Sequence, residues 1–284
     1  MDPSPALLLR VGELQAGTRD RLVAVLSDYS LLAIQEDDVS NPQTWTAHFA
    51  TAADRQSALD ALRGSSDFGG LRIETLEVED DDWARRTQAD LPAIQIGRVL
   101  VCPPWDVRVP TAPDEIVVLI EPSRGFGTGH HQSTRLCLAL LQNRNLSGQT
   151  MIDVGTGSGV LAVAGAKLGA AYVAAIDNDP DAIENARENI ATNGVQNVVE
   201  AHVEDFTSVR RAAADVVTAN LTGTMLARHA AQLKPLIRPA GVVISAGFTE
   251  DEKHMVEDAF APDFEITESA EEEGWWAYVC TRRT

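Results

Sequence analysis

The stretch Met151-Ile152-Asp153-Val154-Gly155-Thr156-Gly157-Ser158-Gly159 decides the fold. Its first four residues indicate a buried β-strand, and its glycines form a turn into an alanine-rich helix predicted over Val160–Leu168. Glycines let the chain turn sharply and approach a ligand closely, and the first amides of the helix face the crevice at the strand end. A single glycine turn is weak evidence, so its ligand has to be inferred from the residues around it.

A carboxylate follows the next predicted strand. The apolar run Tyr172–Ile176 ends at Asp177, 22 residues after Gly155. At the end of the second strand of such a domain, a carboxylate accepts hydrogen bonds from both ribose hydroxyls of an adenosine. Asp177 and the loop glycines Gly155 and Gly157 are therefore predicted to bind a cofactor that contains a nucleoside.

The charge of the loop distinguishes between nucleoside cofactors. A dinucleotide-binding loop has glycine or alanine at its sixth position, where this sequence has Val160, and the third glycine comes one residue early, at Gly159. Asp153 places a carboxylate at the strand end, which disfavours a pyrophosphate and suits a cation. S-adenosylmethionine carries a sulfonium, an ammonium and no phosphate, so the loop favours it over NAD. A cap on the loop is the alternative role for Asp153.

Strands and helices alternate after residue 150, as a parallel doubly wound sheet requires. Asn178-Asp179-Pro180 is a helix start with Asp179 as the N-cap, and Asn193-Gly194 ends that helix. Further strands are predicted over Val198–Val203, Asp215–Ala219 and Gly241–Ala246, with a final antiparallel pair over Phe264–Thr267 and Trp276–Thr281. The expected fold is an α/β domain of the class I, Rossmann-like type with a seven-stranded sheet.

Two more polar positions follow predicted strands. Asn220 comes after the fourth strand, at the edge where open α/β sheets bind ligands, and its amide can donate to and accept from a substrate amine or the cofactor. An ordinary turn asparagine is the alternative. Asp205, after the third strand, could accept a hydrogen bond from an adenine amino group. Leu221-Thr222-Gly223 lacks the Pro-Pro-aromatic pattern of enzymes that methylate nucleobase amines, which argues against that substrate class.

The first 77 residues form a separate module in this prediction. Strands and helices are expected in the order βαββαβ, over Ala6–Val11, Arg19–Tyr29, Leu31–Gln35, Thr44–Ala50, Asp54–Leu62 and Leu71–Leu76. That order is typical of a small α+β, ferredoxin-like sandwich. Residues 78–120 are predicted to be a linker and strand platform, with strand-like runs Ile94–Cys102 and Glu115–Ile120, and residues 121–284 the catalytic domain.

Composition limits the environment and the partners. The 284 residues include 42 acidic and 23 basic side chains, and the net charge of -19 repels phosphate backbones and favours a basic partner. No apolar run approaches the ~20 residues of a membrane-spanning helix, and the N-terminus lacks the basic flank of a secretory signal. We therefore expect a cytoplasmic protein that binds neither membranes nor a specific nucleic acid. Three widely spaced cysteines suit neither a disulfide framework nor a zinc site.

The stretch EPSRGFGTGHHQST at Glu121–Thr134 strongly resembles a segment peculiar to the bacterial ribosomal protein L11 methyltransferase (PrmA) family. IDVGTGSGVLAVAGAKLGA at Ile152–Ala170, AIDNDPDAIENARENIATNG at Ala175–Gly194 and ADVVTANL at Ala214–Leu221 extend the resemblance. It covers the chain from about Asp82 to the C-terminus and is weak in residues 1–76. The resemblance implies transfer of methyl groups from S-adenosylmethionine to amino groups of a ribosomal large-subunit protein, a basic substrate that residues 1–77 would recognise.

The resemblance also implies site residues. Thr134, Gly155, Asp177 and Asn220 match the positions that contact the cofactor in this family, and Asn220 is the candidate for aligning the reacting amine. The turn Phe126–Gly129 would cover the methionine end of the cofactor, with the Phe126 ring against the sulfonium.

Two adjacent histidines raise the question of a metal. His130 and His131 point apart in any regular chain and have no evident third ligand, so no metal is expected. For His131 a structural role in the turn is favoured, and a general-base role is the alternative.

Three other functions stay open at this level. A methyltransferase of another protein or of a small amine would have the same catalytic domain with a different recognition module. An NAD-dependent oxidoreductase would have the same sheet, although Val160 and Asp153 disfavour it. A non-enzymatic binding protein would have no need of the glycines and carboxylates of the loop.

Overall fold

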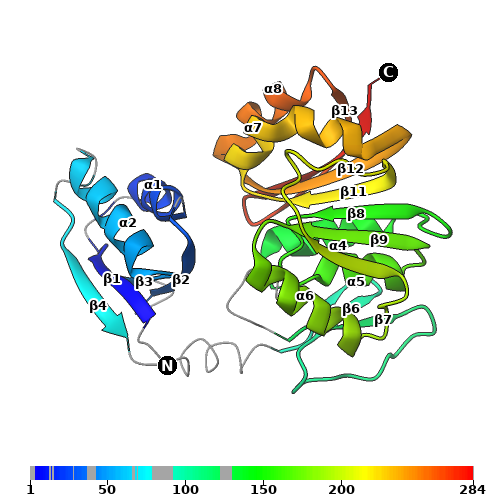
Figure 1. The fold of residues 1–284 in the computed structure, drawn as a ribbon, viewed down its shortest axis with the longest axis horizontal. Coiled ribbons are helices and arrows are strands. Elements are labelled where there is room, and N and C mark those ends of the chain that lie inside the picture. Colours follow the sequence, from blue (N-terminus) through cyan, green and yellow to red (C-terminus); the bar gives the residue numbers. More distant parts are fainter. Residues whose placement is uncertain are drawn as a thin grey trace. The chain divides into compact units, whose positions relative to one another are not determined.

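The computed structural model describes residues 4–12, 14, 16–27, 29–36, 43–65, 68, 70–78, 92–121 and 130–283. The chain divides into two compact units, residues 1–88 and 89–284 (Figure 1). Each unit has its own hydrophobic core. Of the predicted linker and strand platform, residues 78–120, the described residues 92–120 belong to the second unit.

The first unit is a four-stranded antiparallel sheet with two helices. Its elements are β1 (Ser4–Arg10), α1 (Ala16–Ser27), β2 (Leu31–Glu36), β3 (Thr44–Phe49), α2 (Ala52–Gly64) and β4 (Ile73–Val78). The strand order β2-β3-β1-β4 places the two ends of the unit's chain side by side in the sheet and gives the predicted ferredoxin-like arrangement. Leu7 and Leu9 of β1 pack against Leu59 and Leu62 of α2 in its core.

A seven-stranded sheet forms the centre of the second unit. Its strands are β8 (Thr150–Val154), β9 (Tyr172–Asp177), β10 (Val199–Val203), β11 (Ala214–Asn220), β12 (Ile237–Thr249), β13 (Phe264–Glu272) and β14 (Trp275–Arg282). They lie in the order β10-β9-β8-β11-β12-β14-β13; the first five are parallel, and β14 runs antiparallel to both of its neighbours. The predicted class I, Rossmann-like sheet is confirmed.

Helices cover both faces of this sheet (Figure 1). Helices α4 (Gln132–Gln142), α5 (Val160–Lys167) and α6 (Pro180–Thr192) share a core with one face, and α7 (Gly223–Leu233) and α8 (Lys253–Phe260) share a core with the other. Successive residues of β8 show why: Met151 belongs to the first core and Ile152 to the second, because neighbouring side chains of a strand point to opposite faces. Two 3-10 turns, η2 (Lys234–Leu236) and η3 (Glu250–Glu252), flank β12.

A small sheet corrects one prediction. The run Ile94–Cys102, predicted as a single strand, is a hairpin of β5 (Ile94–Ile96) and β6 (Val99–Cys102), and β6 pairs in parallel with β7 (Ile116–Leu119). The chain reverses at Gly97, whose φ of 57° is in the left-handed region that glycine tolerates. The run looked continuous because every residue of β6 is buried and apolar.

Two further elements differ from the prediction. Helix α4 was not among the predicted elements, although Gln132, Arg135, Ala139 and Gln142 lie along one partly exposed side and its other seven residues are buried. Strand β13 continues five residues past the predicted end at Thr267. It is an edge strand whose last residues, Glu268–Glu272, are mostly polar and at least partly exposed, so the apolar pattern stops before the pairing does. Across the ranges given above, no helix combines the length and apolar character needed to cross a membrane.

Candidate functional site

The candidate site lies at the carboxyl edge of the parallel sheet. Val154 of β8 pairs with Ile176 of β9 and with Ala219 of β11, so these three strands end side by side. The loops that follow them therefore begin at one edge, where ligands bind in open α/β sheets. This register brings the predicted loop glycines, Asp177 and Asn220 to one part of the molecule.

The glycine loop runs from Gly155 to Gly159 and has the conformation that only glycine adopts readily. Gly155, Gly157 and Gly159 have φ angles of 65°, 53° and 82°. A Cβ on Gly155 would lie 2.5 Å from Cδ2 of Leu221, and one on Gly159 would lie 3.3 Å from Cβ of Ala186 in α6. Glycine is therefore favoured at all three positions by the backbone shape, and at Gly159 the close approach of α6 adds a packing reason.

Asp177 is held in place by two backbone amides. Its Oδ2 accepts a hydrogen bond from the Gly157 amide at 3.0 Å, and its Oδ1 accepts one from the Asp179 amide at 3.1 Å. Each carboxylate oxygen has a second lone pair, and Asp177 is only half-buried. The carboxylate thus joins the glycine loop to the start of α6, where Asp179 is the N-cap as predicted, and keeps acceptor capacity for two hydroxyls.

Asp153 lies beneath the loop, not on its rim. Only 1% of the residue is exposed, and its carboxylate accepts hydrogen bonds from the hydroxyls of Thr156 at 2.6 Å and Thr218 at 2.5 Å. Burial raises the pKa of this carboxyl to about 6. The contact with Thr156 matches the loop-capping role that the sequence left open for Asp153. Because the residue is buried, its carboxylate can act on a ligand only through its charge.

Thr134 and Asn220 meet across 86 residues of sequence. The Asn220 side-chain amide donates to the Thr134 hydroxyl at 3.1 Å, joining the end of β11 to the first turn of α4. Thr134 is buried and Asn220 is partly exposed at the sheet edge. The two predicted positions are therefore neighbours, although their roles in binding and catalysis stay predictions.

Gly247 is a residue that sequence reasoning missed. It has a φ of 100°, and a Cβ there would lie 2.2 Å from the carbonyl oxygen of Leu221 and 3.1 Å from Oδ1 of Asn220. The Leu221 amide donates to the carbonyl of Ala246 at 3.0 Å. This glycine therefore lets the turn after Asn220 lie directly against β12. Its sequence signal was only a glycine near the end of a predicted strand, which often marks a bulge or a close approach.

A second missed residue, Asn189 of α6, links the glycine loop to the chain that follows β7. Its Nδ2 donates to the carbonyl of Ser158 at 2.9 Å, and its Oδ1 accepts from the Glu121 amide at 2.9 Å. The residue is 1% exposed. One turn later Asn193 contacts both backbone groups of Leu119. A polar residue beside the apolar Ala186–Ile190 face was the available signal, because buried amides require partners.

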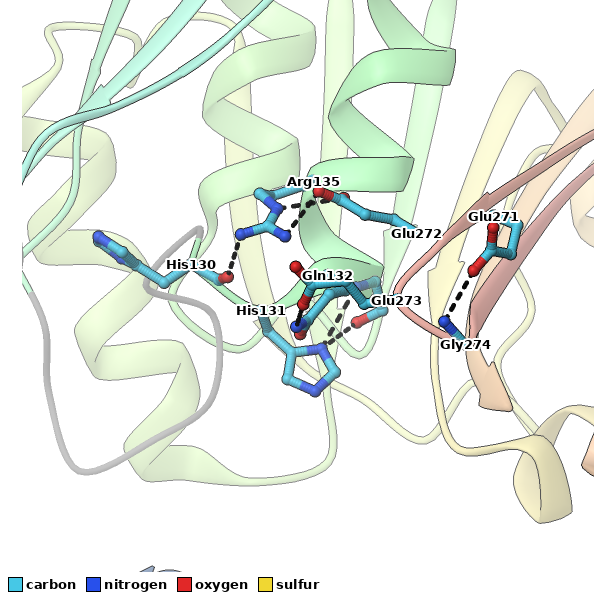
Figure 2. Close-up of polar contacts among 9 residues, drawn as sticks. His130, His131, Gln132, Arg135, Glu271, Glu272, Glu273 and Gly274 are labelled. Atoms are coloured by element: carbon cyan, nitrogen blue, oxygen red, sulfur yellow. Dashed lines mark hydrogen bonds and ion pairs between the residues drawn. The ribbon is translucent and has the colours of Figure 1, made fainter. Parts of the chain in front are cut away.

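The contacts of His131 are structural. His131 is the N-cap of α4 (Figure 2): its Nδ1 accepts from the Ser133 amide at 3.3 Å and lies 2.8 Å from the Ser133 hydroxyl. Its ring also packs edge-on against Trp275. Burial lowers the pKa of His131, which favours the neutral ring that a cap needs. In the described part of the chain, no three metal-binding side chains group together. The predicted turn Phe126–Gly129 lies outside the described residues.

Asp205 lies in a turn. Its Oδ1 accepts hydrogen bonds from the amide and the hydroxyl of Thr207, at 2.8 and 2.7 Å, and the residue is exposed. These contacts hold the chain after β10, and the proposed contact with an adenine amino group stays a prediction. Cys102, Cys137 and Cys280 are buried free thiols that pack in the cores.

Comparisons with known proteins identify the family of this chain. A family model described as ribosomal protein L11 methyltransferase (PrmA) matches residues 8–283. The ribosomal protein L11 methyltransferase of Vibrio cholerae serotype O1 is 38% identical over 207 residues, which cover 72% of this chain and 69% of the relative. The protein of the same name from Cupriavidus pinatubonensis is 40% identical over 212 residues, which cover 73% of this chain and 67% of the relative.

One solved structure extends the comparison to three dimensions. The crystal structure of a ribosomal protein L11 methylase from Lactobacillus delbrueckii subsp. bulgaricus superimposes with a TM-score of 0.63 and 27% identity, covering 68% of this chain and 99% of that one. The family match includes the N-terminal unit, where the sequence by itself showed only a weak resemblance.

Proposed function

Because the chain belongs to the ribosomal protein L11 methyltransferase (PrmA) family, we propose that it transfers methyl groups from S-adenosylmethionine to amino groups of a ribosomal large-subunit protein. Lysine side chains, with the N-terminal amine as a second class, are the proposed acceptors. The observation that carries the proposal is the contact between the Gly157 amide and the Asp177 carboxylate, which combines a close-approach glycine loop with a fixed, partly exposed acceptor.

The residues present fit this cofactor. The positive φ angles of Gly155 and Gly157 give the loop its sharp turn at the strand end, and Asp177 keeps lone pairs for two ribose hydroxyls. The buried Asp153 provides negative charge below the loop, which attracts a sulfonium and an ammonium and repels a pyrophosphate. The same charge disfavours the NAD-dependent alternative.

The chain contributes orientation to the reaction. When bound, S-adenosylmethionine supplies an electrophilic methyl group on its sulfonium. The Nδ2 of Asn220 is held by Thr134, so its Oδ1 has a fixed direction and can accept an N–H of the incoming amine. The amine must lose a proton before it attacks, and a dry pocket next to a cation lowers its pKa, so the transfer requires no dedicated base.

The substrate assignment is supported by charge. A net charge of -19 attracts a basic protein, and the N-terminal unit is the proposed recognition module. A methyltransferase of another protein or a small amine is the alternative that shares the same catalytic unit. The cytoplasmic location stays a prediction.

Incubating the purified protein with radiolabelled S-adenosylmethionine and an undermethylated ribosomal extract tests activity and substrate together. We expect one labelled band at the mass of a large-subunit ribosomal protein. Label on a different protein would overturn the substrate, and no label on any protein or amine would overturn the activity.

The cofactor has a separate test. We expect S-adenosylmethionine, and not NAD, to raise the melting temperature, and Asp177→Ala to weaken its binding in calorimetry. A variant that binds as the parent does would overturn the ribose role of Asp177.

A further inference from the structure

The β13–β14 hairpin ends in a turn whose shape is fixed by its own contacts. Glu273 and Gly274 both have positive φ angles, of 52° and 83°. The Glu271 carboxylate accepts a hydrogen bond from the Gly274 amide at 2.7 Å, and the Gly274 carbonyl accepts one from the Glu250 amide at 3.2 Å, at the end of β12. The hairpin tip, residues 271–274, is thus anchored to the carboxyl edge of the sheet.

The hairpin tip contacts the start of α4 through charged and polar side chains (Figure 2). The Arg135 guanidinium pairs with both oxygens of Glu272, at 2.6 and 3.1 Å, and Gln132 donates to Glu273. Arg135 also donates to the carbonyl of His130 at 3.2 Å. A bidentate pair of this kind fixes direction as well as distance.

An aromatic contact extends this junction. The His131 ring packs edge-on against Trp275, the first residue of β14, with ring centroids 4.5 Å apart. Because Trp275 directly follows the tip, consecutive residues of the hairpin contact the cap and the first turn of the helix. All three glutamates of the tip already have partners within the protein, so they form a junction and not an open acidic surface.

The first turn of α4 is also the turn that carries Thr134. Thr134 accepts the hydrogen bond of Asn220 from β11, while its neighbour Arg135 is held by Glu272 from β13. Asn220 and the hairpin tip are therefore hydrogen-bonded to adjacent residues of the same helix turn.

We propose that Arg135 and Glu272 are positioning residues for the candidate site, which hold Thr134 in reach of Asn220. The inference rests on the proposed function, in which Thr134 holds Asn220 and Asn220 aligns the reacting amine. A displacement of about 1 Å at a reacting centre can cost roughly 10²-fold in rate, so a junction distant from the cofactor is sufficient to affect turnover.

The chain contains a matched control. Arg144, just after the end of α4, pairs with Glu268 of the same strand β13. The side chains of this pair are 28% and 39% exposed, against 22% and 37% for Arg135 and Glu272. Glu272→Gln and Glu268→Gln therefore remove ion pairs of similar exposure between β13 and the segment that contains α4, one beside Thr134 and one two residues past the end of the helix.

Calorimetry with S-adenosylmethionine and steady-state kinetics on the full chain separate the two variants. We expect Glu272→Gln to raise the dissociation constant about fivefold and to lower kcat, and Glu268→Gln to leave both within about twofold at a similar loss of melting temperature. Arg135→Lys keeps the charge but loses the fork that serves Glu272 and His130 together, so we expect an intermediate effect.

The side-chain amide signal of Asn220 in NMR spectra, assigned with Asn220→Ala, gives a readout that needs no cofactor. We expect it to shift in Glu272→Gln and not in Glu268→Gln. Equal effects of the two variants on binding and on this signal would overturn the positioning role. Failure of the parent protein to bind S-adenosylmethionine would instead overturn the proposed function, and the Asn220 signal would still test the junction.

Discussion

Asp153 and Asp177 come at the ends of neighbouring strands, yet the fold gives their carboxylates different chemistry. Asp177 is partly exposed and accepts from two backbone amides. Asp153 is buried and accepts from two hydroxyls, and burial raises its pKa to about 6. The two backbone amides orient the Asp177 carboxylate and leave it accessible to a ligand. Burial of Asp153 instead makes the charge of the Asp153 carboxyl depend on pH near neutrality.

The raised pKa of Asp153 predicts a pH dependence of cofactor binding. A carboxyl with a pKa of about 6 is charged above that pH and neutral below it. We therefore expect the affinity for S-adenosylmethionine, measured by calorimetry, to fall about tenfold as the pH is lowered from roughly 7 to roughly 5, because the charge that attracts the cation is lost. Asp153→Asn should bind more weakly and lose this dependence. An unchanged pH profile in that variant would contradict the prediction.

Asn220 gives a prediction about turnover. Removing its amide by Asn220→Ala should lower kcat about 10²-fold, because the amine is no longer aligned, and should cost only about 1 kcal/mol of the free energy of unfolding. Thr134→Val removes the hydrogen-bond acceptor and keeps the shape, so it serves as the comparison. We expect it to lower kcat less than Asn220→Ala does. Full activity of Asn220→Ala would remove Asn220 from the mechanism.

At the scale of elements, α6 connects separate parts of the second unit through two asparagines one helical turn apart. Asn189 bridges Ser158 of the glycine loop and Glu121 after β7. The Asn193 side chain is hydrogen-bonded to backbone groups of Leu119 and Asn189. The helix therefore holds the back of the loop at one position and the end of β7 at the other.

This arrangement predicts different outcomes for two similar substitutions. Asn189→Leu and Asn193→Leu each leave backbone groups without partners, so we expect each to lower the free energy of unfolding by about 2 kcal/mol in urea titrations. Only Asn189→Leu should weaken S-adenosylmethionine binding, by about tenfold, because only Asn189 contacts the loop. If the two variants bind the cofactor equally well, the loop does not depend on α6.

At the scale of the whole molecule, the net charge governs the electrostatic attraction of a protein substrate. A net charge of -19 extends an attractive potential toward a basic partner over roughly the Debye length, ~10 Å at 0.1 M salt. Contacts inside the catalytic unit are much less screened, because water and ions are excluded there.

Salt should therefore act on the two substrates differently. Between roughly 0.05 and 0.5 M potassium chloride, we expect KM for the ribosomal protein to rise at least about tenfold. KM for S-adenosylmethionine should change by less than about threefold over the same range. Initial-rate measurements at each salt concentration provide both values. A KM for the protein substrate that does not vary with salt would show that net charge has no part in recognition.

Local patterns predicted those elements whose residues carry the signal themselves. The strand expected over Met151–Val154 is β8, and the helix start at Asp179-Pro180 is the start of α6. Prediction was less successful where most residues of an element are buried, or most are exposed, because the regular alternation of apolar and polar residues is then lost. Strand β6 is buried throughout and was predicted as one strand with β5, and the edge strand β13 looks polar past Thr267.

The sequence by itself determined the sheet, the glycine loop, the position of Asp177 and, through the family segment, the identity of Thr134 and Asn220. Only the tertiary structure decided that Asn220 is hydrogen-bonded to Thr134 and that Asp153 is buried beneath the loop. It also decided that Asn189 contacts the glycine loop and that the hairpin tip contacts the first turn of α4. The reason is physical: a turn or a cap depends on residues a few positions apart, whereas these contacts depend on strand register and helix packing, which join residues 31 to 137 positions apart.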